Sequence, residues 1–225
     1  MDLSFGQWRV RLRPDGPALA SAHALRAAMF RGGRPDRDRF DAGAEHLTIH
    51  AGDRLAACAR LMPQDRAGML LGYAAERYDL RPLVPAHARA VELGRVCLAL
   101  PDPELPRVLL AALGRVVAAR RATLLYGCAS FGPSERAALG RMRPHVARTG
   151  PGRASPDAVP LPLSGTGTLP PLLRLYLAFG ATVSDHAVQD PDLGTVHVLA
   201  MLDRAAIPPA RLRSLRALAP EGVPG

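Results

Sequence analysis

The feature that most constrains the fold is the stretch over residues 91–110, VELGRVCLALPDPELPRVLL. Its first ten residues are apolar apart from one carboxylate, one glycine and one guanidinium, which is typical of a strand buried on both faces. Prolines end that strand, and helical spacing of leucines and valines predicts a helix from Glu104 to about Arg121. A buried strand followed directly by such a helix indicates an α/β (or α+β) fold.

Two charged residues in this apolar run are the first candidates for chemistry. Glu92 and Arg95 lie where burial is predicted, and a buried charge is costly unless it is paired or used. Residues three apart on a regular strand face opposite sides, but Gly94 lies between them, and a glycine inside a strand often marks a bulge. We therefore predict a bulge near Gly94 that turns both side chains toward one cleft. The spacing leaves a structural Glu–Arg pair open as the alternative.

The rest of the chain predicts strands and helices around one mixed sheet. Alternating polarity predicts an edge strand over residues 7–13 and a hairpin of strands 45–51 and 54–62, joined by Gly52-Asp53. Residues 123–131 are predicted to form a second buried strand, and residues 181–188 and 195–202 a closing hairpin. Helical spacing predicts helices over residues 18–30, 78–83, 134–142, 170–179 and 208–218. The inward-facing residues expected on the first of these helices are Leu19, Ala22, Leu25 and Met29.

The domain organisation predicted from the sequence is simple. No linker or repeat divides the 225 residues, so we expect one domain over residues 1–225. Residues 143–168 hold prolines, glycines and arginines with little pattern, and we expect them to form a long mobile loop and a lid.

Charge and cysteine content narrow the class of protein. All 29 basic residues are arginines and the net charge is +9, yet no arginine run is interleaved with aromatic residues, so we expect no nucleic-acid binding. A basic surface suits an acidic partner, either a carrier protein or an anionic lipid surface. Cys58, Cys97 and Cys128 lack CxxC spacing and are expected to be reduced core residues. Without a signal peptide or a run of ~20 apolar residues, we expect a cytoplasmic protein with at most peripheral membrane contact.

Several polar residues outside the central strand are candidates for binding. Arg26 and Phe30 are four apart and share one face of the first predicted helix. The following loop over residues 31–44, RGGRPDRDRFDAGA, is typical of a solvated surface. However, its Asp38 and Asp41 bracket an aromatic residue, and two carboxylates placed over a cleft would grip an amine.

The order of several short segments resembles one enzyme family. The segments are ELGR at residues 92–95, YGCASF at 126–131 and PPLLRLYLAFGA at 170–181, preceded by HL and ARL on a predicted hairpin. They resemble the ornithine lipid biosynthesis N-acyltransferases, a branch of the Gcn5-related N-acyltransferase superfamily that is similar to acyl-homoserine-lactone synthases. The resemblance runs from about Leu25 to Leu202. It implies that superfamily's mixed central sheet flanked by helices, with two central strands splayed apart.

This resemblance also implies a reaction and a donor. In ornithine–acyl carrier protein N-acyltransferases, a 3-hydroxyacyl group moves from acyl carrier protein to the α-amine of ornithine and gives a lyso-ornithine lipid. The superfamily's pyrophosphate loop, RxxGxG, is missing after Leu100. That absence fits a carrier-protein donor, and we expect no cofactor beyond the phosphopantetheine of the carrier.

The resemblance assigns site residues by position. The pattern shared with the lactone synthases matches Arg26, Phe30, Asp38, Asp41, Arg60, Glu92 and Arg95. It implies that the residues of the first helix and the acidic loop shape the amine side, while Glu92 and Arg95 lie at the reaction centre. The chain departs from the family at Arg31, where an acidic residue often follows the helix aromatic, and at His197, where an aspartate is expected.

Aminolysis of a thioester needs a neutral amine and a proton acceptor. Glu92 is the expected base because burial makes a carboxylate more basic, and Arg95 would orient it or a substrate carboxylate. His46 is a second candidate base, although a lone histidine at the start of a strand is more often structural. No histidine shows metal-ligand spacing, so we expect no metal.

The substrate groups suggest the remaining roles. Asp38 and Asp41 suit the distal ammonium of ornithine, and Arg26 or Arg60 suits its carboxylate. The apolar walls for the acyl and pantetheine chains would come from the two buried strands, although ordinary core packing is the commoner role for any one such residue. The candidates are Leu98, Leu100, Leu124, Leu125 and Phe131.

Three alternatives remain open at this stage. The same transfer to glutamine, or to another amino acid, would give a different aminolipid. Acyl-homoserine-lactone synthesis would require S-adenosylmethionine. A non-enzymatic, arginine-rich protein that binds lipid or nucleic acid is the third, and the predicted burial of Glu92 argues against it.

Overall fold

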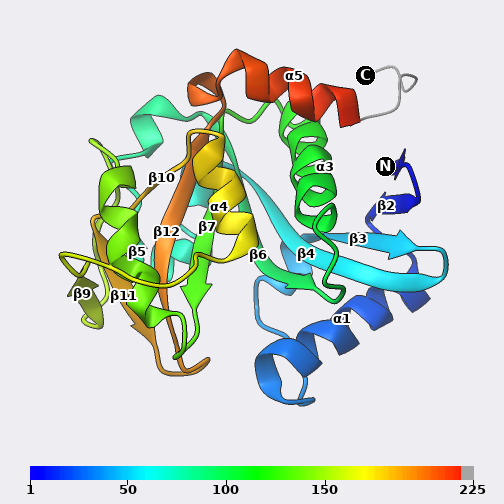
Figure 1. The fold of residues 1–225 in the computed structure, drawn as a ribbon, viewed down its shortest axis with the longest axis horizontal. Helices are drawn as coiled ribbons and strands as arrows, with labels where there is room; N and C mark the ends of the chain where they lie inside the picture. Colours follow the sequence, from blue (N-terminus) through cyan, green and yellow to red (C-terminus); the bar gives the residue numbers. More distant parts are fainter. Residues whose placement is uncertain (219–225) are drawn as a thin grey trace. The chain divides into compact units, whose positions relative to one another are not determined.

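The computed structural model describes residues 1–218, which contacts group into two compact units interleaved in sequence. The first unit comprises Met1–Pro63, Leu93–Arg121 and the described part of Pro209–Gly225. The second comprises Gln64–Glu92 and Ala122–Pro208. Because the chain crosses repeatedly from one unit to the other, no linker marks them in the sequence. Figure 1 gives the labels of the elements used below.

The first unit is built on neighbouring strands in the order β1-β2-β3-β4-β6, with antiparallel pairing from β1 to β4. The strands are β1 (Asp2–Phe5), β2 (Trp8–Leu12), β3 (Glu45–Ala51), most of β4 (Arg54–Asp65) and the second half of β6 (Arg89–Leu98). The helices are α1 (Gly16–Arg31), the short η1 (Asp41–Gly43), α3 (Leu105–Ala119) and α5 (Pro209–Leu218). Figure 1 shows α1 and α3 on opposite sides of β3 and β4.

Helix α1 has clear end signals. The side chain of Asp15 accepts a hydrogen bond from Ala18 N at 3.1 Å, and Gly32 ends the helix in the left-handed conformation with φ 58°. The helix predicted over residues 18–30 and the hairpin of β3 and β4 are confirmed, but two details of the prediction are wrong. Strand β1 lies outside β2, so β2 is not the sheet edge, and Met29 is 51% exposed rather than inward. The inner face of α1 is taken instead by Arg26, whose ion partners are also in this unit.

The second unit continues from the first half of β6, which pairs in parallel with β7 (Leu124–Phe131). Further strands follow in the order β7-β12-β11-β9, where β12 is Thr195–Asp203, β11 is His186–Asp190 and β9 is Ala158–Pro160. β10 (Thr182–Val183) pairs with β12, and β5 (Tyr78–Asp79) pairs with β8 (Gly152–Arg153). The helical segments are α2 (Arg66–Met69), η2 (Ala74–Glu76), η3 (Val84–Ala86), η4 (Arg136–His145), α4 (Pro171–Ala178) and η5 (Arg204–Ala206).

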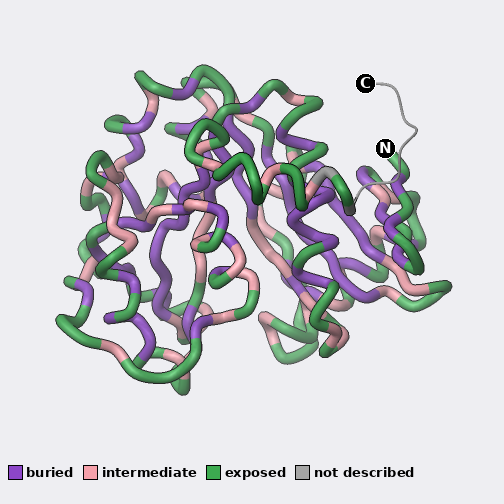
Figure 2. Tube along the Cα trace, turned by 45° about the horizontal axis from the view of Figure 1, so that its top comes forward, coloured by how far each residue is buried: buried purple, intermediate pink, exposed green. Residues whose placement is uncertain are grey.

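The sheet of the second unit is covered on both faces, as the apolar runs predict. On β12, Val196 and Val198 pack in one cluster with Leu173 of α4, whereas Leu199 packs in the other with Tyr78. This alternation of successive side chains is the period of a strand buried on two sides. Figure 2 shows buried residues along these strands and exposed residues in the connecting turns.

Several predicted elements of this unit change. Residues 78–83 are not a helix, because Tyr78–Asp79 pairs with β8 as a strand. The predicted helix over 134–142 is the 3₁₀ helix Arg136–His145, and residues 143–168 contain strands β8 and β9, so they are only partly loop. The closing hairpin and helix α4 are confirmed. Among the described residues, no helix has both the length and the apolar character needed to cross a membrane.

Candidate active site

The first unit holds a cluster of buried charges centred on Arg26. This guanidinium is 1% exposed, on the inner face of α1. Its Nε donates to Asp36 Oδ2 at 3.0 Å, while its NH1 and NH2 groups donate to the two oxygens of Asp41 at 2.6 and 3.0 Å. The bidentate pair with Asp41 is the geometry in which arginine binds a carboxylate most strongly. Arg26 is thus a buried anchor for the acidic loop that follows α1.

Asp36 is a member of this cluster that the sequence analysis missed. Its oxygens accept from Arg31 Nε at 3.3 Å and from Arg95 Nε at 3.0 Å, besides Arg26. Burial alone would raise the pKa of Asp36, but Arg95, Arg26 and Arg31 outweigh it and hold the pKa below its usual value. A signal was present, since Asp36 is the first of three acidic residues in the loop 36–41.

Asp38 is the most exposed carboxylate of the cluster. It accepts from Arg60 NH1 at 2.5 Å and from Arg95 NH2 at 3.3 Å, and its side chain is 24% exposed against 11% for Asp41. The side chain of Arg60 is fully buried on β4. Burial alone would raise the pKa of Asp41, but the hydrogen bonds and charge of Arg26 hold it well below its usual value. At neutral pH Asp41 is therefore a carboxylate.

Arg95 lies at the backbone irregularity predicted near Gly94. The backbone of Arg95 has φ 50°, a left-handed conformation that is uncommon for a residue with a side chain. Gly94, by contrast, does not have a positive φ. Its guanidinium lies 5.7 Å from the ring centre of Phe30, which packs against Ala22 and Cys58. Bonds to two carboxylates and this ring contact hold the unusual backbone in place. The structure thus brings Arg26, Phe30, Asp38, Asp41, Arg60 and Arg95 into one unit, whereas Glu92, which the resemblance pairs with Arg95, belongs to the other.

His46 lies at the margin of the same cluster. It is 8% exposed on β3, with Nε2 3.8 Å from Asp41 Oδ1 and its ring 5.2 Å from that of His23. Burial, with contributions from Arg26, lowers the pKa of His46 to about 4 despite Asp41, so its imidazole is neutral at pH 7. So low a pKa makes His46 a weak proton acceptor, although its role as a base stays a prediction.

Within residues 1–218, one group of side chains has the spacing of a metal site, namely His23, Asp41 and His46, whose ligand atoms lie within 4.8 Å of one another. The donor set fits a cation poorly. Both oxygens of Asp41 accept from Arg26, and Arg37 lies 2.9 Å from His23 Nδ1, so a metal ion would face two guanidinium groups. We assign no metal here.

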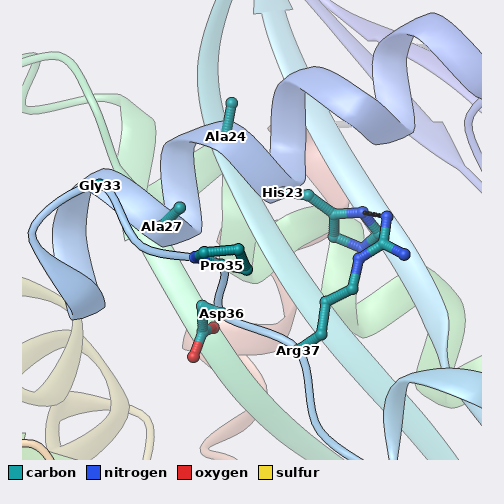
Figure 3. Close-up of a pocket in the computed structure, with 7 residues that line it drawn as sticks. All are labelled: His23, Ala24, Ala27, Gly33, Pro35, Asp36 and Arg37. Atoms are coloured by element: carbon teal, nitrogen blue, oxygen red, sulfur yellow. Dashed lines mark hydrogen bonds between the residues drawn. The ribbon is translucent and has the colours of Figure 1, made fainter.

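A pocket of about 440 Å³ opens beside the same histidine, between α1 and the loop 33–37. Figure 3 shows His23 and Arg37 on one side of it, with Ala24 and Ala27 of α1 along the helix and Pro35 facing them. Apart from the histidine and arginine, the walls shown are mainly small or apolar groups. The pocket therefore adds an apolar recess to the charged cluster.

Glu92 belongs to the second unit and has a different environment. It is 1% exposed on β6, directly opposite Tyr126 in the last recorded pair of the parallel β6–β7 ladder. Its carboxylate accepts from Ala74 N at 2.6 Å, from Gln64 Nε2 at 3.0 Å and from Tyr126 Oη at 3.5 Å. The predicted burial is confirmed, and these partners are neutral donors. No sequence signal marked Gln64, whereas Tyr126 lies in the YGCASF segment.

Close backbone approach shapes this second site. A Cβ on Gly72 would overlap both the Glu92 carboxylate and the Gln64 amide, so these two side chains would have to shift to accommodate it. The Tyr126 hydroxyl also donates to the Gln64 side-chain oxygen. Burial and the charge of Glu92 raise the pKa of Tyr126 well above its usual value, so this hydroxyl stays protonated. Gln64 is half-buried and is the most exposed member of the trio with Glu92 and Tyr126.

The residues predicted to line an acyl chain fall into two groups. Leu124, Leu125 and Phe131 are at most 4% exposed, and Leu124 and Phe131 pack in the two core clusters of the second unit. Leu98 and Leu100, by contrast, are half-buried. The half-buried pair has surface available to a ligand in this structure, and the lining role of all five stays a prediction.

His197, at the position where the resemblance led us to expect an aspartate, is a core residue. It is 1% exposed, and its Nδ1 lies 3.0 Å from the hydroxyl of Tyr78, which also donates to the His197 carbonyl oxygen at 2.9 Å. Burial lowers its pKa to about 4, so the ring is neutral at pH 7. The histidine at this position therefore forms a neutral polar pair with Tyr78 in the core of the second unit.

Comparison with known proteins identifies the family of the chain. A family model described as an acetyltransferase (GNAT) domain matches residues 23–101, which include the charge cluster and Glu92. The chain is 28% identical to the L-ornithine N(alpha)-acyltransferase of Rhodobacter capsulatus, an alignment that covers 89% of this chain and 91% of that protein. It is 30% identical to the L-ornithine N(alpha)-acyltransferase of Brucella abortus, with 88% and 84% covered.

Solved structures resemble the fold. The N-acyl amino acid synthase FeeM from uncultured soil microbes has a TM-score of 0.57 at 11% identity, over 91% of this chain and 98% of that one. The acyl-homoserine-lactone synthase LasI has a TM-score of 0.52 at 16% identity, over 87% and 89%. These likenesses confirm the predicted Gcn5-related N-acyltransferase-like fold.

Proposed function

The chain belongs to the family of L-ornithine N(alpha)-acyltransferases and is an acyltransferase, and we propose that it moves a 3-hydroxyacyl group from acyl carrier protein to the α-amine of ornithine. The product is a lyso-ornithine lipid. The observation that carries the proposal is Glu92, a carboxylate at 1% exposure that accepts hydrogen bonds from Gln64 Nε2 and Ala74 N. Family membership speaks against the non-enzymatic alternative.

In the proposed reaction, the neutral α-amine attacks the thioester carbonyl carbon, the C–N bond forms and the C–S bond breaks. The amine's proton goes to Glu92, directly or through a water molecule. The leaving thiolate takes a proton, for which the protonated Tyr126 hydroxyl is a donor within hydrogen-bond distance of Glu92. Gln64, being half-buried, is the side chain that an amine would displace in order to reach Glu92. Backbone N–H groups at the irregular strand would stabilise the oxyanion.

The charge cluster of the first unit supplies the proposed amino-acid contacts. Asp38 is the carboxylate that we assign to the distal ammonium, because it is more exposed than Asp41. Asp41, which Arg26 binds through both oxygens, would then position the loop rather than bind substrate. Arg60 or Arg95 would hold the substrate carboxylate, as bidentate arginine contacts commonly do.

The donor and the site of product release are further parts of the proposal. The missing pyrophosphate loop after Leu100 favours a carrier-protein thioester over coenzyme A. The product is a lipid, and Leu70 and Leu71, which follow helix α2, are 42% and 75% exposed, so we refer to this pair as the apolar tip. We assign peripheral membrane contact to this tip.

The decisive experiment incubates the purified full chain with 3-hydroxyacyl carrier protein and ornithine, glutamine, lysine or S-adenosylmethionine, and identifies products by mass. We expect acyl-ornithine with the carrier donor and at most trace product with the matching acyl-coenzyme A. Product from glutamine but not ornithine would replace the amine assignment, and product only with S-adenosylmethionine would indicate lactone synthesis.

Variants test the individual roles. Glu92→Gln should lower the transfer rate by about 10²-fold or more if Glu92 is the base, whereas the exposed Glu104→Gln should leave it unchanged. Asp38→Asn should raise the KM for ornithine and leave that for glutamine nearly unaltered. Full activity in Glu92→Gln would refute the proposed base.

A further inference from the structure

Two of the three cysteines touch each other beneath the charge cluster of the first unit. Cys58 on β4 and Cys97 on β6 are 1% and 0% exposed, and their thiols donate to Ala22 O and Arg95 O, each at 3.7 Å. Both are free thiols that pack with Ala22 of α1 in a small apolar cluster. Cys128 lies in the second unit and is partly exposed.

The backbone places the two thiols directly opposite each other. Ala99 N donates to Ala56 O at 2.7 Å across the same two strands. Cys58 is two residues further along β4 and Cys97 is two residues earlier on β6, which is the register of an antiparallel pair. Opposed residues of this kind have Cα atoms about 5.5 Å apart, within the range of about 4.4–6.8 Å that a disulfide spans. A strand displacement on the order of 1 Å is therefore enough to join them.

The same register connects the thiols to the charge cluster. Arg60 is two residues beyond Cys58 on β4, and Arg95 is two residues before Cys97 on β6. Both arginines donate to Asp38, and Arg95 also donates to Asp36. A disulfide requires an S–S distance of about 2.05 Å, far shorter than the contact distance between two free thiols. Closing that gap would draw β4 and β6 together where these arginines begin.

We propose that Cys58 and Cys97 form a reversible disulfide whose formation displaces Arg60 and Arg95 and lowers amine binding. The oxidant is a peroxide. The Cys58 thiolate attacks a peroxide oxygen and forms a sulfenic acid as the O–O bond breaks, and Cys97 sulfur then displaces water. Two thiols and one hydrogen peroxide thus give one disulfide and two waters, and a thiol reductant reverses the change.

Because the thiols of Cys58 and Cys97 are buried, we expect them to react with some reagents and not with others. A bulky aromatic disulfide reagent should modify Cys128 alone in the folded chain, because the opposed thiols are at most 1% exposed. A small oxidant, hydrogen peroxide or diamide, should nevertheless oxidise Cys58 and Cys97 together. Ordinary buried cysteines would resist both kinds of reagent.

The test treats the purified full chain and its Cys128→Ser variant with hydrogen peroxide and maps disulfides by peptide mass before and after reduction. We expect a Cys58–Cys97 linked peptide in both proteins, and none in Cys58→Ala or Cys97→Ala. Recovery of both free thiols after oxidation and denaturation would overturn the proposal, as would oxidation beyond sulfenic acid without a linked peptide.

The activity arm rests on the proposed function, whereas the mass arm does not. Oxidation should lower kcat/KM for the amine by about tenfold or more, because displacements near 1 Å cost up to about 10²-fold, and dithiothreitol should restore it. Cys128→Ser should respond like the wild type, and Cys58→Ala should not respond. A linked peptide with unchanged kcat/KM would overturn the control of the charge cluster. Absence of ornithine transfer in the reduced protein would instead count against the proposed function.

Discussion

The carboxylates of the first unit and Glu92 of the second are stabilised by different kinds of donor. Asp36 and Asp41 accept from guanidinium groups, which hold their pKa values low. Glu92 accepts from an amide, a hydroxyl and a backbone N–H. A charged partner favours the ionised form more strongly than a neutral hydrogen bond does. The carboxylates of the first unit therefore suit binding and positioning, whereas Glu92 suits proton transfer.

The largest expected effect comes from removing the guanidinium group of Arg26 from the charge cluster. Arg26→Ala should lower the free energy of unfolding by about 3–5 kcal/mol, because it removes the bidentate partner of Asp41 and one of the three arginines that pair with the buried Asp36. Urea denaturation measures this loss. The matched change at the exposed Arg34, Arg34→Ala, should cost less than about 0.5 kcal/mol. A loss below about 1 kcal/mol for Arg26→Ala would contradict the anchoring role.

The next effect concerns the neutral His46 beside that cluster. Its pKa falls from 6.5 to about 4 in the folded chain, so between those values the unfolded chain binds a proton that the folded chain does not. The free energy of unfolding should therefore keep its full value above pH 6.5 and decline by up to about 3 kcal/mol as the pH falls to 4. His46→Gln should remove this part of the slope in urea titrations, and His145→Gln should retain it. An unchanged slope in His46→Gln would mean that other groups cause the decline.

The smallest expected effect concerns the space around Glu92 and its neutral donors. Gly72→Ala should cost about 1–3 kcal/mol and reduce acyl transfer, since its Cβ would push against Glu92 and Gln64. The control is the same substitution at Gly114 in α3, where a Cβ meets nothing within 4 Å. Gly114→Ala should be neutral or stabilise by up to about 1 kcal/mol and leave transfer unchanged. Equal behaviour of the two variants would show that the space around Glu92 does not limit activity.

Much of the local structure was predictable because its physical cause is local. The hairpin of β3 and β4 follows from alternating polarity and Gly52-Asp53, and strand β6 follows from an apolar run. Strand β1 and the two-residue β5 were missed because such short segments carry little periodic signal. The placement of Arg26 inside α1 was also beyond a pattern of apolar residues, since only its ion partners make that burial favourable.

By itself, the sequence determined which side chains carry chemistry: the Glu92–Arg95 strand, the acidic loop and the arginines of α1 and β4 all stand out as charges within or beside apolar segments. Tertiary structure alone decided how each charge is neutralised. It gave Asp36 three arginines, gave Glu92 the neutral donors Gln64 and Tyr126, and put two cysteines face to face. The reason is that pairing depends on segments far apart in the chain, whose approach no local pattern encodes.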